Sequence, residues 1–532
     1  MTSAGAARQP QADRPPRSAL VLLALVTGAI VSNVNLSIAN VALPTIGAEL
    51  GATQDQITSV ADAFALGLAS TVLYLGSIGD RHGRKLLFVV GAVLTIPTSM
   101  MAAWSTSPGM LALARFLCGF AAALLFPTTL SIIAALYRGR ARVSAIALWS
   151  GLGGGVAALG PVIGGWLLQY FWWGSVFLVA VPLAALALIV GLFVLPWRAS
   201  EEAFAVDHLG GVLSVIGVGG LVLAIERADN GFTPGWITLC AVSLMALAAF
   251  GWRQTRAPRP LVSLPLARAR TFWVAFVAGS ITFGSLIGAM FIGQQFTQNV
   301  LGYDTLTAAA VVLPAAACTA VFGQLAGRLI PPFGSRFTFM LGLGAVAAAF
   351  TLMLLTWTTG TAMGWVLAAY ALVGTGVGLA ATPASRSLMS SVPASRGGMG
   401  SAFLDLTRDL GGAVLQAVMG AILAGAYAAR ILADLAGLPP AQAAQVSTSA
   451  ANQMASSFEG AAEVATSYPQ AGAEQVVAAA SAAFVDGKTS AIGVALMLTL
   501  AGLALVLLAY PRRQQEEAYY AVVLSGNVKE NR

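Results

Sequence analysis

Long apolar runs, each of a length that crosses a bilayer as a helix, follow one another through most of this 532-residue chain. A span needs about 20 residues, because the hydrocarbon core is about 30 Å thick and a helix rises about 1.5 Å per residue. Hydrophobic residues make up 58% of the chain and charged residues only 9%, which excludes a soluble globular domain of this size. The sequence therefore predicts an all-α polytopic membrane protein.

Counting these runs predicts fourteen transmembrane helices, in two groups of six with an inserted pair between them. Most of the 28 Lys and Arg residues then fall on one side of the membrane. The positive-inside rule makes that side the cytoplasm and places both termini there. The predicted spans lie near 18–43, 55–78, 85–105, 108–137, 140–168, 172–196, 208–226, 234–252, 272–298, 304–330, 335–357, 361–390, 397–430 and 489–511.

This layout divides the chain into a succession of membrane bundles and tails. The predicted segments are a cytoplasmic N-terminal tail at 1–17, a six-helix bundle at 18–196, a linker with two inserted spans at 197–271, a second six-helix bundle at 272–511 and a cytoplasmic tail at 512–532.

A long extracellular loop is predicted at 431–488, within the second bundle. It is rich in Ala, Gln and Ser and is too polar to span the membrane. Its Ala-rich stretches around 441–457 and 471–485 favour short amphipathic helices over the outer face. A lid and a tolerated surface loop are both compatible with this composition.

A compact charged turn, GSIGDRHGRK at 76–85, lies between the second and third spans. Glycines permit a tight turn there, and its charged residues stay in water at the inner surface. The stretch closely resembles the G-x-L-x-D-R-x-G-R-[KR] signature of the major facilitator superfamily. The resemblance implies two six-helix bundles and an inner gate in which Asp80 pairs with Arg81 and Arg84. The expected gate residues are Gly76, Asp80, Arg81, Gly83 and Arg84.

A degenerate copy of this turn, GRLIPPFGSR at 327–336, occupies the equivalent place in the second group. Pro331 and Pro332 stand where the first copy has Asp80 and Arg81. Duplicated halves with a substrate site between them are common among secondary transporters. The sequence therefore predicts an internal repeat whose two gates are unequal.

Ionisable residues inside the predicted spans are functional candidates, because each costs about 2.5 to 3.5 kcal/mol at a helix centre. Burial favours the protonated form of a carboxyl, so such a group can exchange a proton or hold a cation. A structural network of paired charges is the alternative interpretation. Arg115 also resembles the fourth-helix arginine that the superfamily places near its proton pathway. The candidates for proton coupling or cation binding are Asp62, Arg115, Asp405 and Asp409, with Arg408 beside the last two.

The fifth span contains GLGGGVAALGPVIGG, whose small residues permit close helix packing. Its spacing resembles the antiporter signature of the superfamily, carried here by Gly151, Gly160, Pro161, Gly164 and Gly165. The stretches NVALPTI, WWGSVFLVAVP and QNVLGYDTLTAAAVVLP also resemble the fourteen-helix drug:proton antiporters, in particular the quaternary-ammonium and methyl-viologen exporters. That branch usually carries an Asp where this chain has Asn35.

Neutral polar and aromatic residues complete the predicted substrate cavity. They orient a ligand without requiring charge, and aromatic faces supply cation–π contacts. The candidates are Asn33, Asn35, Phe64, Trp149, Gln294 and Gln298.

The resemblance implies a proton-coupled exporter of amphipathic, cationic drugs, acting as a monomer in the bacterial cytoplasmic membrane. Export or uptake of a neutral metabolite or lipid is the alternative, and a membrane scaffold is a third interpretation. No ATP-binding loop, cofactor motif or metal-ligand cluster occurs in the sequence, so we expect a gradient as the energy source and no covalent chemistry. The net charge of +7 is dispersed among the spans, which favours membrane orientation over nucleic-acid binding.

Overall fold

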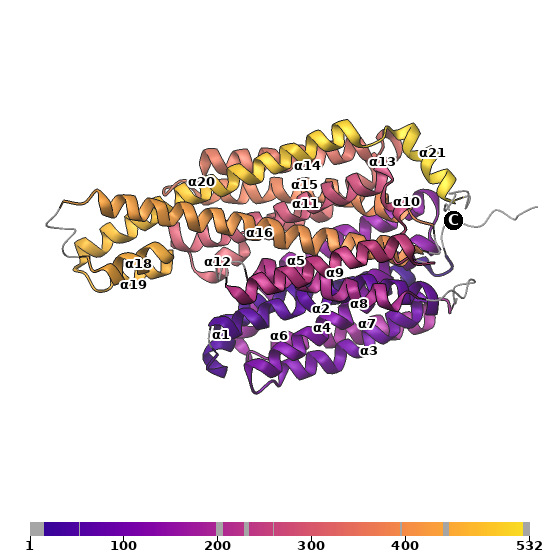
Figure 1. Ribbon diagram of the computed structural model, residues 1–532, viewed down its shortest axis with the longest axis horizontal. Coiled ribbons are helices and arrows are strands. Elements are labelled where there is room, and N and C mark those ends of the chain that lie inside the picture. The colour runs from indigo at the N-terminus through magenta and orange to yellow at the C-terminus, as the bar shows by residue number, and fades with distance from the viewer. Residues whose placement is uncertain are drawn as a thin grey trace, which may run out of the picture.

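Helices that lie side by side along the long axis of the molecule form the whole of its regular structure over the residues described (Figure 1). The computed structural model describes residues 15–52, 54–197, 206–227, 233–258, 260–393, 396–439 and 446–524. This architecture confirms the predicted all-α fold class.

The first half contains six spans built from seven helices. A short break at Val179 divides the sixth span in two. The helices are α1 (Ser18–Leu50), α2 (Gln54–His82), α3 (Arg84–Ala103), α4 (Pro108–Leu136), α5 (Gly139–Tyr170), α6 (Ser175–Leu178) and α7 (Ala180–Val194).

The inserted pair, α8 (His208–Glu226) and α9 (Pro234–Arg256), packs beside α2. A Cβ on Gly211 would meet the Tyr74 ring at 2.2 Å, so only glycine lets α8 approach α2 this closely. The Tyr74 hydroxyl also lies 2.7 Å from Nδ1 of His208. The pair is therefore attached to the first half, and the short helix α10 (Leu264–Ala267) follows it.

The second half repeats the six-span pattern. At the end of α11 the chain tightens into a π-helical turn, η2, before it turns back. The spans and their short helices are α11 (Arg270–Gln295), η2 (Phe296–Val300), α12 (Thr305–Ala310), α13 (Leu313–Phe333), α14 (Ser335–Thr356), α15 (Met363–Ser390), α16 (Gly397–Ala436) and α20 (Gln470–Ala509).

Thirteen helices are long and apolar enough to cross a membrane, as judged over the described part of the chain. The expected fifth span corresponds to α5, a 32-residue helix that is not among the thirteen. The side chains at 153–158 and at Pro161 on α5 lie outside the described residues. With α5 in its place, the order of long helices follows the predicted order of fourteen spans.

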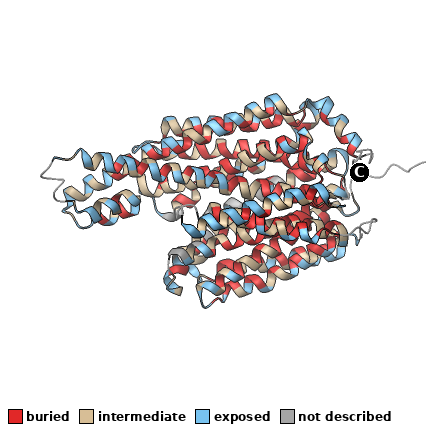
Figure 2. Cartoon of the chain, viewed as in Figure 1, coloured by how far each residue is buried: buried red, intermediate tan, exposed pale blue. Residues whose placement is uncertain are grey.

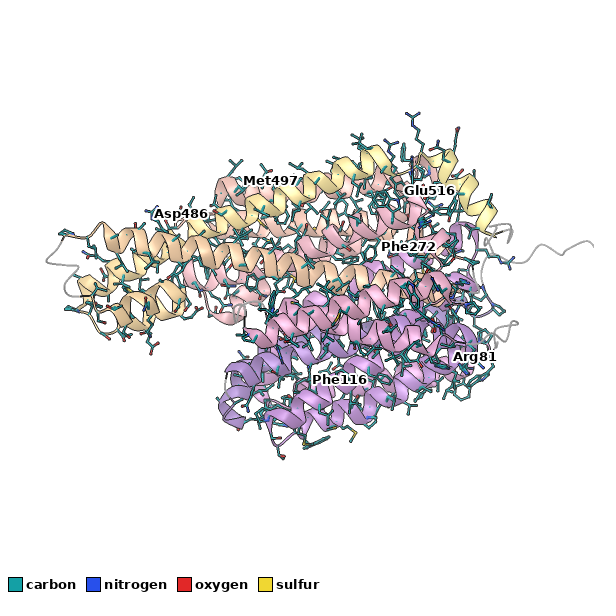
Figure 3. All side chains as sticks on the ribbon, viewed as in Figure 1. Arg81, Phe116, Phe272, Asp486, Met497 and Glu516 are labelled. Atoms are coloured by element: carbon teal, nitrogen blue, oxygen red, sulfur yellow. The ribbon has the colours of Figure 1, made fainter. Side chains whose placement is uncertain are left out.

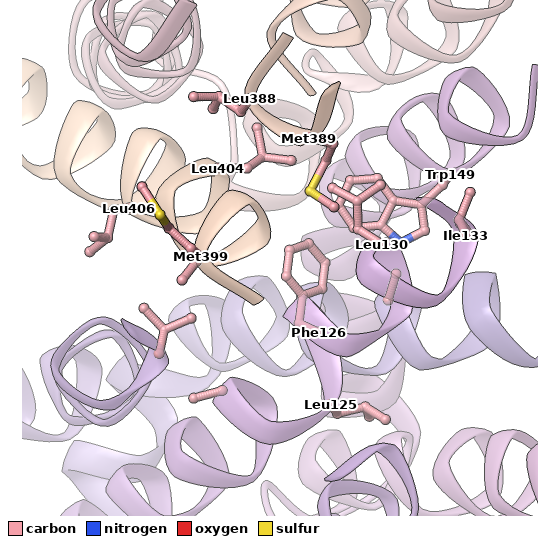
Figure 4. Packing of buried hydrophobic residues seen from close by; sticks show 14 of the residues in the cluster. Leu125, Phe126, Leu130, Ile133, Trp149, Leu388, Met389, Met399, Leu404 and Leu406 are labelled. Carbon is pink, nitrogen blue, oxygen red and sulfur yellow. The ribbon is translucent and has the colours of Figure 1, made fainter. Parts of the chain in front are cut away.

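Burial differs sharply between spans and shows which helices form the centre (Figure 2). The most apolar window of α4 is 83% buried, whereas that of α9 is only 11% buried. Helix α4 therefore lies inside the bundle and α9 at its lipid-facing edge. Apolar side chains from the two halves share one core, in which Phe126 and Leu130 of α4 lie near Met389 of α15 and Met399 of α16 (Figure 4).

The region predicted as a long polar loop is largely helical and projects from one end of the molecule (Figure 1). Helices α16 and α20 each contain 40 residues, so both continue well past a membrane-spanning length. Two short helices, α18 (Thr448–Ser456) and α19 (Phe458–Ala465), lie between them. The short amphipathic helix expected at 471–485 is instead the first part of α20; residues 440–445 lie outside the described part. We call α18, α19 and the adjoining ends of α16 and α20 the projection.

The internal repeat appears in the backbone as well as in the sequence. Gly83 between α2 and α3 and Gly334 between α13 and α14 both have positive φ, at 101° and 85°. Lys85, at the start of α3, donates from Nζ to the carbonyls of Leu192 and Leu195 at 2.7 and 2.6 Å. Arg336, at the start of α14, donates in the same way to the carbonyl of Leu507 near the end of α20. In each half a cation therefore caps the C-terminus of the sixth span.

Candidate functional site

Asp80, at the end of α2, binds the first turn of α16 in the other half. The backbone N–H of Gly398 donates to both carboxylate oxygens of Asp80, at 2.9 Å each. Arg84 donates to Oδ1 of Asp80 from Nη2 at 3.0 Å and to the Ser131 carbonyl from Nη1 at 3.1 Å. A carboxylate is favoured at a helix N-terminus because unpaired N–H groups and the helix dipole point at it. This contact joins the two halves.

The main chains of α2 and α16 touch at the same place. A Cβ on Gly398 would lie 2.1 Å from the Gly76 carbonyl oxygen, so the contact requires glycine. Beside it the Ser131 hydroxyl of α4 donates to the Gly397 carbonyl at 3.1 Å and lies 2.9 Å from the Ser401 hydroxyl. Close approach and hydrogen bonds together seal this end of the interface.

Of the two arginines expected to pair with Asp80, the structure places Arg84 there and not Arg81. Arg84 is one turn along the chain from Asp80 and turns back onto it. Arg81 is half-buried at the end of the molecule that also carries Glu516 (Figure 3), and it forms no hydrogen bond or ion pair with the described residues. We call this end, which carries α21 (Arg513–Leu524), the α21 end.

A second contact between the halves lies farther along α16 and is centred on Arg408. Its Nη1 donates to Oδ1 of Asn33 on α1 at 2.7 Å, and its Nε donates to Oδ1 of Asp409 at 3.4 Å. The guanidinium carbon lies 4.4 Å from the centroid of the Phe126 ring on α4. We call Asn33, Phe126, Asp405, Arg408 and Asp409 the central cluster.

The two acids of this cluster keep unused acceptors inside the protein. The Oδ2 atoms of Asp405 and Asp409 are buried and have no hydrogen-bond partner among the described residues. Arg408 and the two carboxyls lie close enough to act on one another electrostatically. An unpaired buried carboxylate is costly, so this arrangement suits a group that takes up a proton or a cation.

Arg115 forms a separate group inside the first half. Its side chain is completely buried, and Nη1 donates to the Asn35 carbonyl at 2.7 Å. The guanidinium also lies 4.8 Å from the Phe64 ring centroid and 5.8 Å from that of Phe177. Nε and Nη2 of Arg115 and Oδ1 of Asn35 have no partner in the described part of the structure. Asp62 is half-buried on the same helix as Phe64.

The expected cavity residues are thus divided among three places. Asn33 lies in the central cluster, and Trp149 is near it because its ring centroid is 5.0 Å from that of Phe126. Asn35 and Phe64 accompany Arg115. Gln294 and Gln298 are half-buried where α11 becomes η2, toward the projection. The sequence alone did not indicate this separation.

The glycines of α5 face two different partners. A Cβ on Gly160 would meet the Ser37 hydroxyl at 2.0 Å, and one on Gly164 would meet Ile38 at 3.0 Å, so both pack on α1. A Cβ on Gly151 would lie 3.1 Å from the Ala320 carbonyl of α13, in the other half. Gly165 is half-buried, and the side chain of Pro161 lies outside the described residues. Helix α5 therefore serves as a packing surface within and between the halves.

Comparison with known proteins decides the family. The model of the Major Facilitator Superfamily matches residues 25–416. The chain belongs to this superfamily.

Known relatives match this chain over nearly its whole length. The chain is 33% identical over 506 residues to the multidrug efflux pump LfrA of Mycolicibacterium smegmatis, covering 94% of this chain and 98% of the relative. It is 30% identical over 513 residues to the drug efflux pump JefA of Mycobacterium tuberculosis, covering 93% and 99%. It is 29% identical over 498 residues to the methyl viologen resistance protein SmvA of Salmonella typhimurium, covering 93% and 97%. The chain is thus a multi-pass membrane transporter.

In the second copy of the turn motif, a different carboxylate takes the place of the missing acid. Glu516 of α21 is 1% exposed. Its Oε2 accepts from the Ser335 backbone N–H at 3.1 Å, and its Oε1 accepts from the Ser335 hydroxyl at 2.5 Å. Arg386 of α15 donates to Oε1 at 3.5 Å. Helix α21 therefore caps α14 and ties it to α15 in this transporter.

Two tyrosines enclose this carboxylate. The hydroxyl oxygens of Tyr510 and Ser387 lie 2.5 Å apart. The Arg386 guanidinium carbon lies 5.6 Å from the centroid of the Tyr520 ring. Burial raises the pKa of both tyrosines, so they remain neutral at physiological pH.

Sequence reasoning missed three residues of these sites. Gly398 and Glu516 make the decisive contacts with the two turn motifs, and Phe126 forms the aromatic face of the central cluster. A glycine pair at the start of α16 is a signal for close approach, but nothing local to Glu516 shows that it docks on a distant turn. Phe126 looks like any apolar residue of a span.

We predict that Asp80→Asn weakens the contact between the halves at the α21 end. The amide cannot form the ion pair with Arg84, and its NH2 group replaces one of the two carboxylate oxygens that accept from Gly398. The contact between the halves should lose about 1–3 kcal/mol. Spin labels at His82→Cys and Phe337→Cys, with the three native cysteines replaced by serine, should report longer and broader distances. Arg81→Gln is the matched control and should leave the distances unchanged; equal effects of the two variants would contradict the assignment.

We also predict that Glu516→Gln loosens α21, because a neutral amide cannot form the charge-assisted bonds to Ser335 and Arg386. Hydrogen exchange of the amides at 513–524 should become faster. The control is Glu517→Gln, since Glu517 is an exposed residue on the same helix that pairs with Arg513 at 2.9 Å. Unchanged exchange in Glu516→Gln would show that α21 is held by its apolar contacts alone.

Proposed function

We propose that this transporter exports amphipathic, cationic small molecules in exchange for protons, by alternating access. Two kinds of observation support the proposal. Relatives that match the chain over more than nine-tenths of its length are named as drug efflux pumps or as a methyl viologen resistance protein. The central cluster supplies buried carboxyls between the two halves.

The unpartnered oxygens of Asp405 and Asp409 carry the proposal. Both residues lie on α16, about seven to eleven residues after Gly398, which is about 10–17 Å along the helix axis. That depth is close to the middle of a span. A proton and a cationic cargo compete for the same buried carboxylate, so inward movement of protons drives outward release of cargo.

The contact of Asp80 with Gly398 serves as the gate on the α21 end. When it is formed, the halves are joined there, and a cycle requires it to break and form again. Arg142 of α5 provides a second link between the halves, donating from Nη2 to the Met389 carbonyl at 3.2 Å. The first link joins a carboxylate to a main-chain N–H, and the second joins a guanidinium to a main-chain carbonyl. We assign the α21 end to the cytoplasm, which places both termini there, in the bacterial cytoplasmic membrane.

The group around Arg115 has a supporting role in the proposal. Arg115 and Asp62 lie on α4 and α2 of the first half, away from the gate, and Arg115 keeps two donor groups unpartnered among the described residues. We assign to Asp62 a part in proton transfer and to Asn35, Phe64, Gln294 and Gln298 the lining of the cargo path. The transporter acts as a monomer, because each half supplies one side of the central cluster.

We predict that Asp409→Asn and Asp405→Asn each slow proton-driven export at least tenfold. An amide of the same shape cannot change its charge when a proton arrives, so it cannot couple the two movements. The measurement is the efflux of ethidium from reconstituted vesicles after a pH gradient is imposed.

Asp434→Asn is the matched control, because Asp434 is on the same helix but forms an exposed pair with Arg430 at 3.0 Å. It should transport at the wild-type rate. Gradient-driven efflux that persists at full rate in both central variants would exclude the α16 carboxyls as the coupling groups. Asp62→Asn in the same assay tests whether the first half contributes a second one.

A further inference from the structure

We propose that the guanidinium of Arg408 occupies the position that the cationic group of the cargo takes in transport, so that cargo binds by displacing it. The inference rests on the proposed function and adds to it: the site takes a single delocalised positive charge, such as that of a planar lipophilic monocation. Arg408 then acts as a tethered competitor that determines which cations enter.

The surroundings of the guanidinium are those that an organic cation requires. It meets an aromatic face at 4.4 Å (Phe126), an amide oxygen at 2.7 Å (Asn33) and a carboxylate oxygen at 3.4 Å (Asp409). Aromatic faces and carboxylates attract positive charge, and the amide oxygen orients an N–H donor. Two of the three groups come from the first half and one from the second, as expected for a site between halves.

Arg408 differs from Arg115, the other arginine inside the bundle. Arg115 is completely buried and is anchored to main chain in its own half. Arg408 has a side chain that is 19% exposed, and its hydrogen bonds to described residues all go to side chains. Its contact with Asp409 is also long for an ion pair between sequence neighbours. A long flexible side chain held in this way can leave without disturbing a helix.

The charges of the cluster leave room for such a displacement. Asp409 and Asp405 supply two carboxyls, and Arg408 supplies one positive charge. When a monovalent cation takes the place next to Asp409, Arg408 can turn to Oδ2 of Asp405, which has no partner among the described residues. Two carboxylates then face two positive charges, one of them the cargo. A divalent cargo would exceed this balance while Arg408 remains.

An internal competitor lowers the apparent affinity of the cargo, because it is present at an effective concentration in the millimolar range. Removing it should tighten binding. We expect Arg408→Gln to lower the dissociation constant of ethidium by about tenfold or more, measured by fluorescence anisotropy with the full-length protein in detergent. Arg408→Lys retains a tethered cation and should stay within about threefold of the wild type.

Arg430→Gln is the matched control, since Arg430 lies on the same helix and pairs at the surface with Asp434 and Asp486. It should not change the affinity. Unchanged or weaker ethidium binding in Arg408→Gln would overturn the inference, because a residue that only stabilises the site would weaken binding when removed. Tighter binding in Arg408→Gln supports it even if the wild type binds too weakly to measure.

A second measurement needs no variant. If the site fits a guanidinium, octylguanidinium should displace ethidium from the wild-type protein at a concentration several-fold lower than octyltrimethylammonium, which lacks N–H donors for Asn33. Equal potency of the two would contradict the inference. Failure of the proposed function is distinguishable: it would appear as absence of gradient-driven ethidium efflux in vesicles, whatever the order of the affinities.

Discussion

The bonds between the Asp80 carboxylate and the first turn of α16 are the interaction on which the arrangement of the two halves depends. They join segments more than 300 residues apart, and they form where Gly76 and Gly398 allow two main chains to touch. A carboxylate at a helix N-terminus is stabilised by the unpaired N–H groups and the helix dipole, so this buried contact holds the two bundles together. The second turn motif has no such acid and instead binds a helix of its own half. Of the two turn motifs, the first therefore provides the contact between the halves.

The central cluster obeys a different constraint, set by the cost of charge in an apolar interior. Arg408 is tolerated because each half contributes a group that satisfies it, and the unused oxygens of Asp405 and Asp409 mark where the arrangement is incomplete. A structural network would be expected to satisfy all its acceptors. The central cluster, with two acceptors unused, is suited to bind a proton or a cation. Arg115 is enclosed in the first half, so it is less suited to take part in that binding than its position inside the membrane suggests.

Much of the fold could be predicted from the sequence because membrane spans are determined by local composition. Apolar length gave the long helices and their order, and the turn at 76–85 indicated the family and Asp80. Contacts across the interface depend on which helix faces are opposed, so the sequence could not distinguish the partners of Arg115 from those of Arg408. Helical structure at 471–485 was expected, but its continuity with the last span was not, because a polar stretch that leaves the membrane as a helix has the composition of a loop. Glu516 was missed for the same reason as Phe126: its importance lies in what it docks against.

The projection has a mechanical consequence. Helices α16 and α20 are each about 60 Å long, roughly twice the hydrocarbon thickness, and they continue without a break out of the second half. Arg430 pairs with Asp486 across them at 2.8 Å, and the Tyr427 hydroxyl donates to the Ser457 carbonyl at 3.1 Å, so the junction of α18 and α19 is tied to α16. A small tilt of the second half therefore becomes a displacement of many ångströms at the far tip. A fluorophore attached to the tip would therefore report a tilt of the second half as a change in its own position.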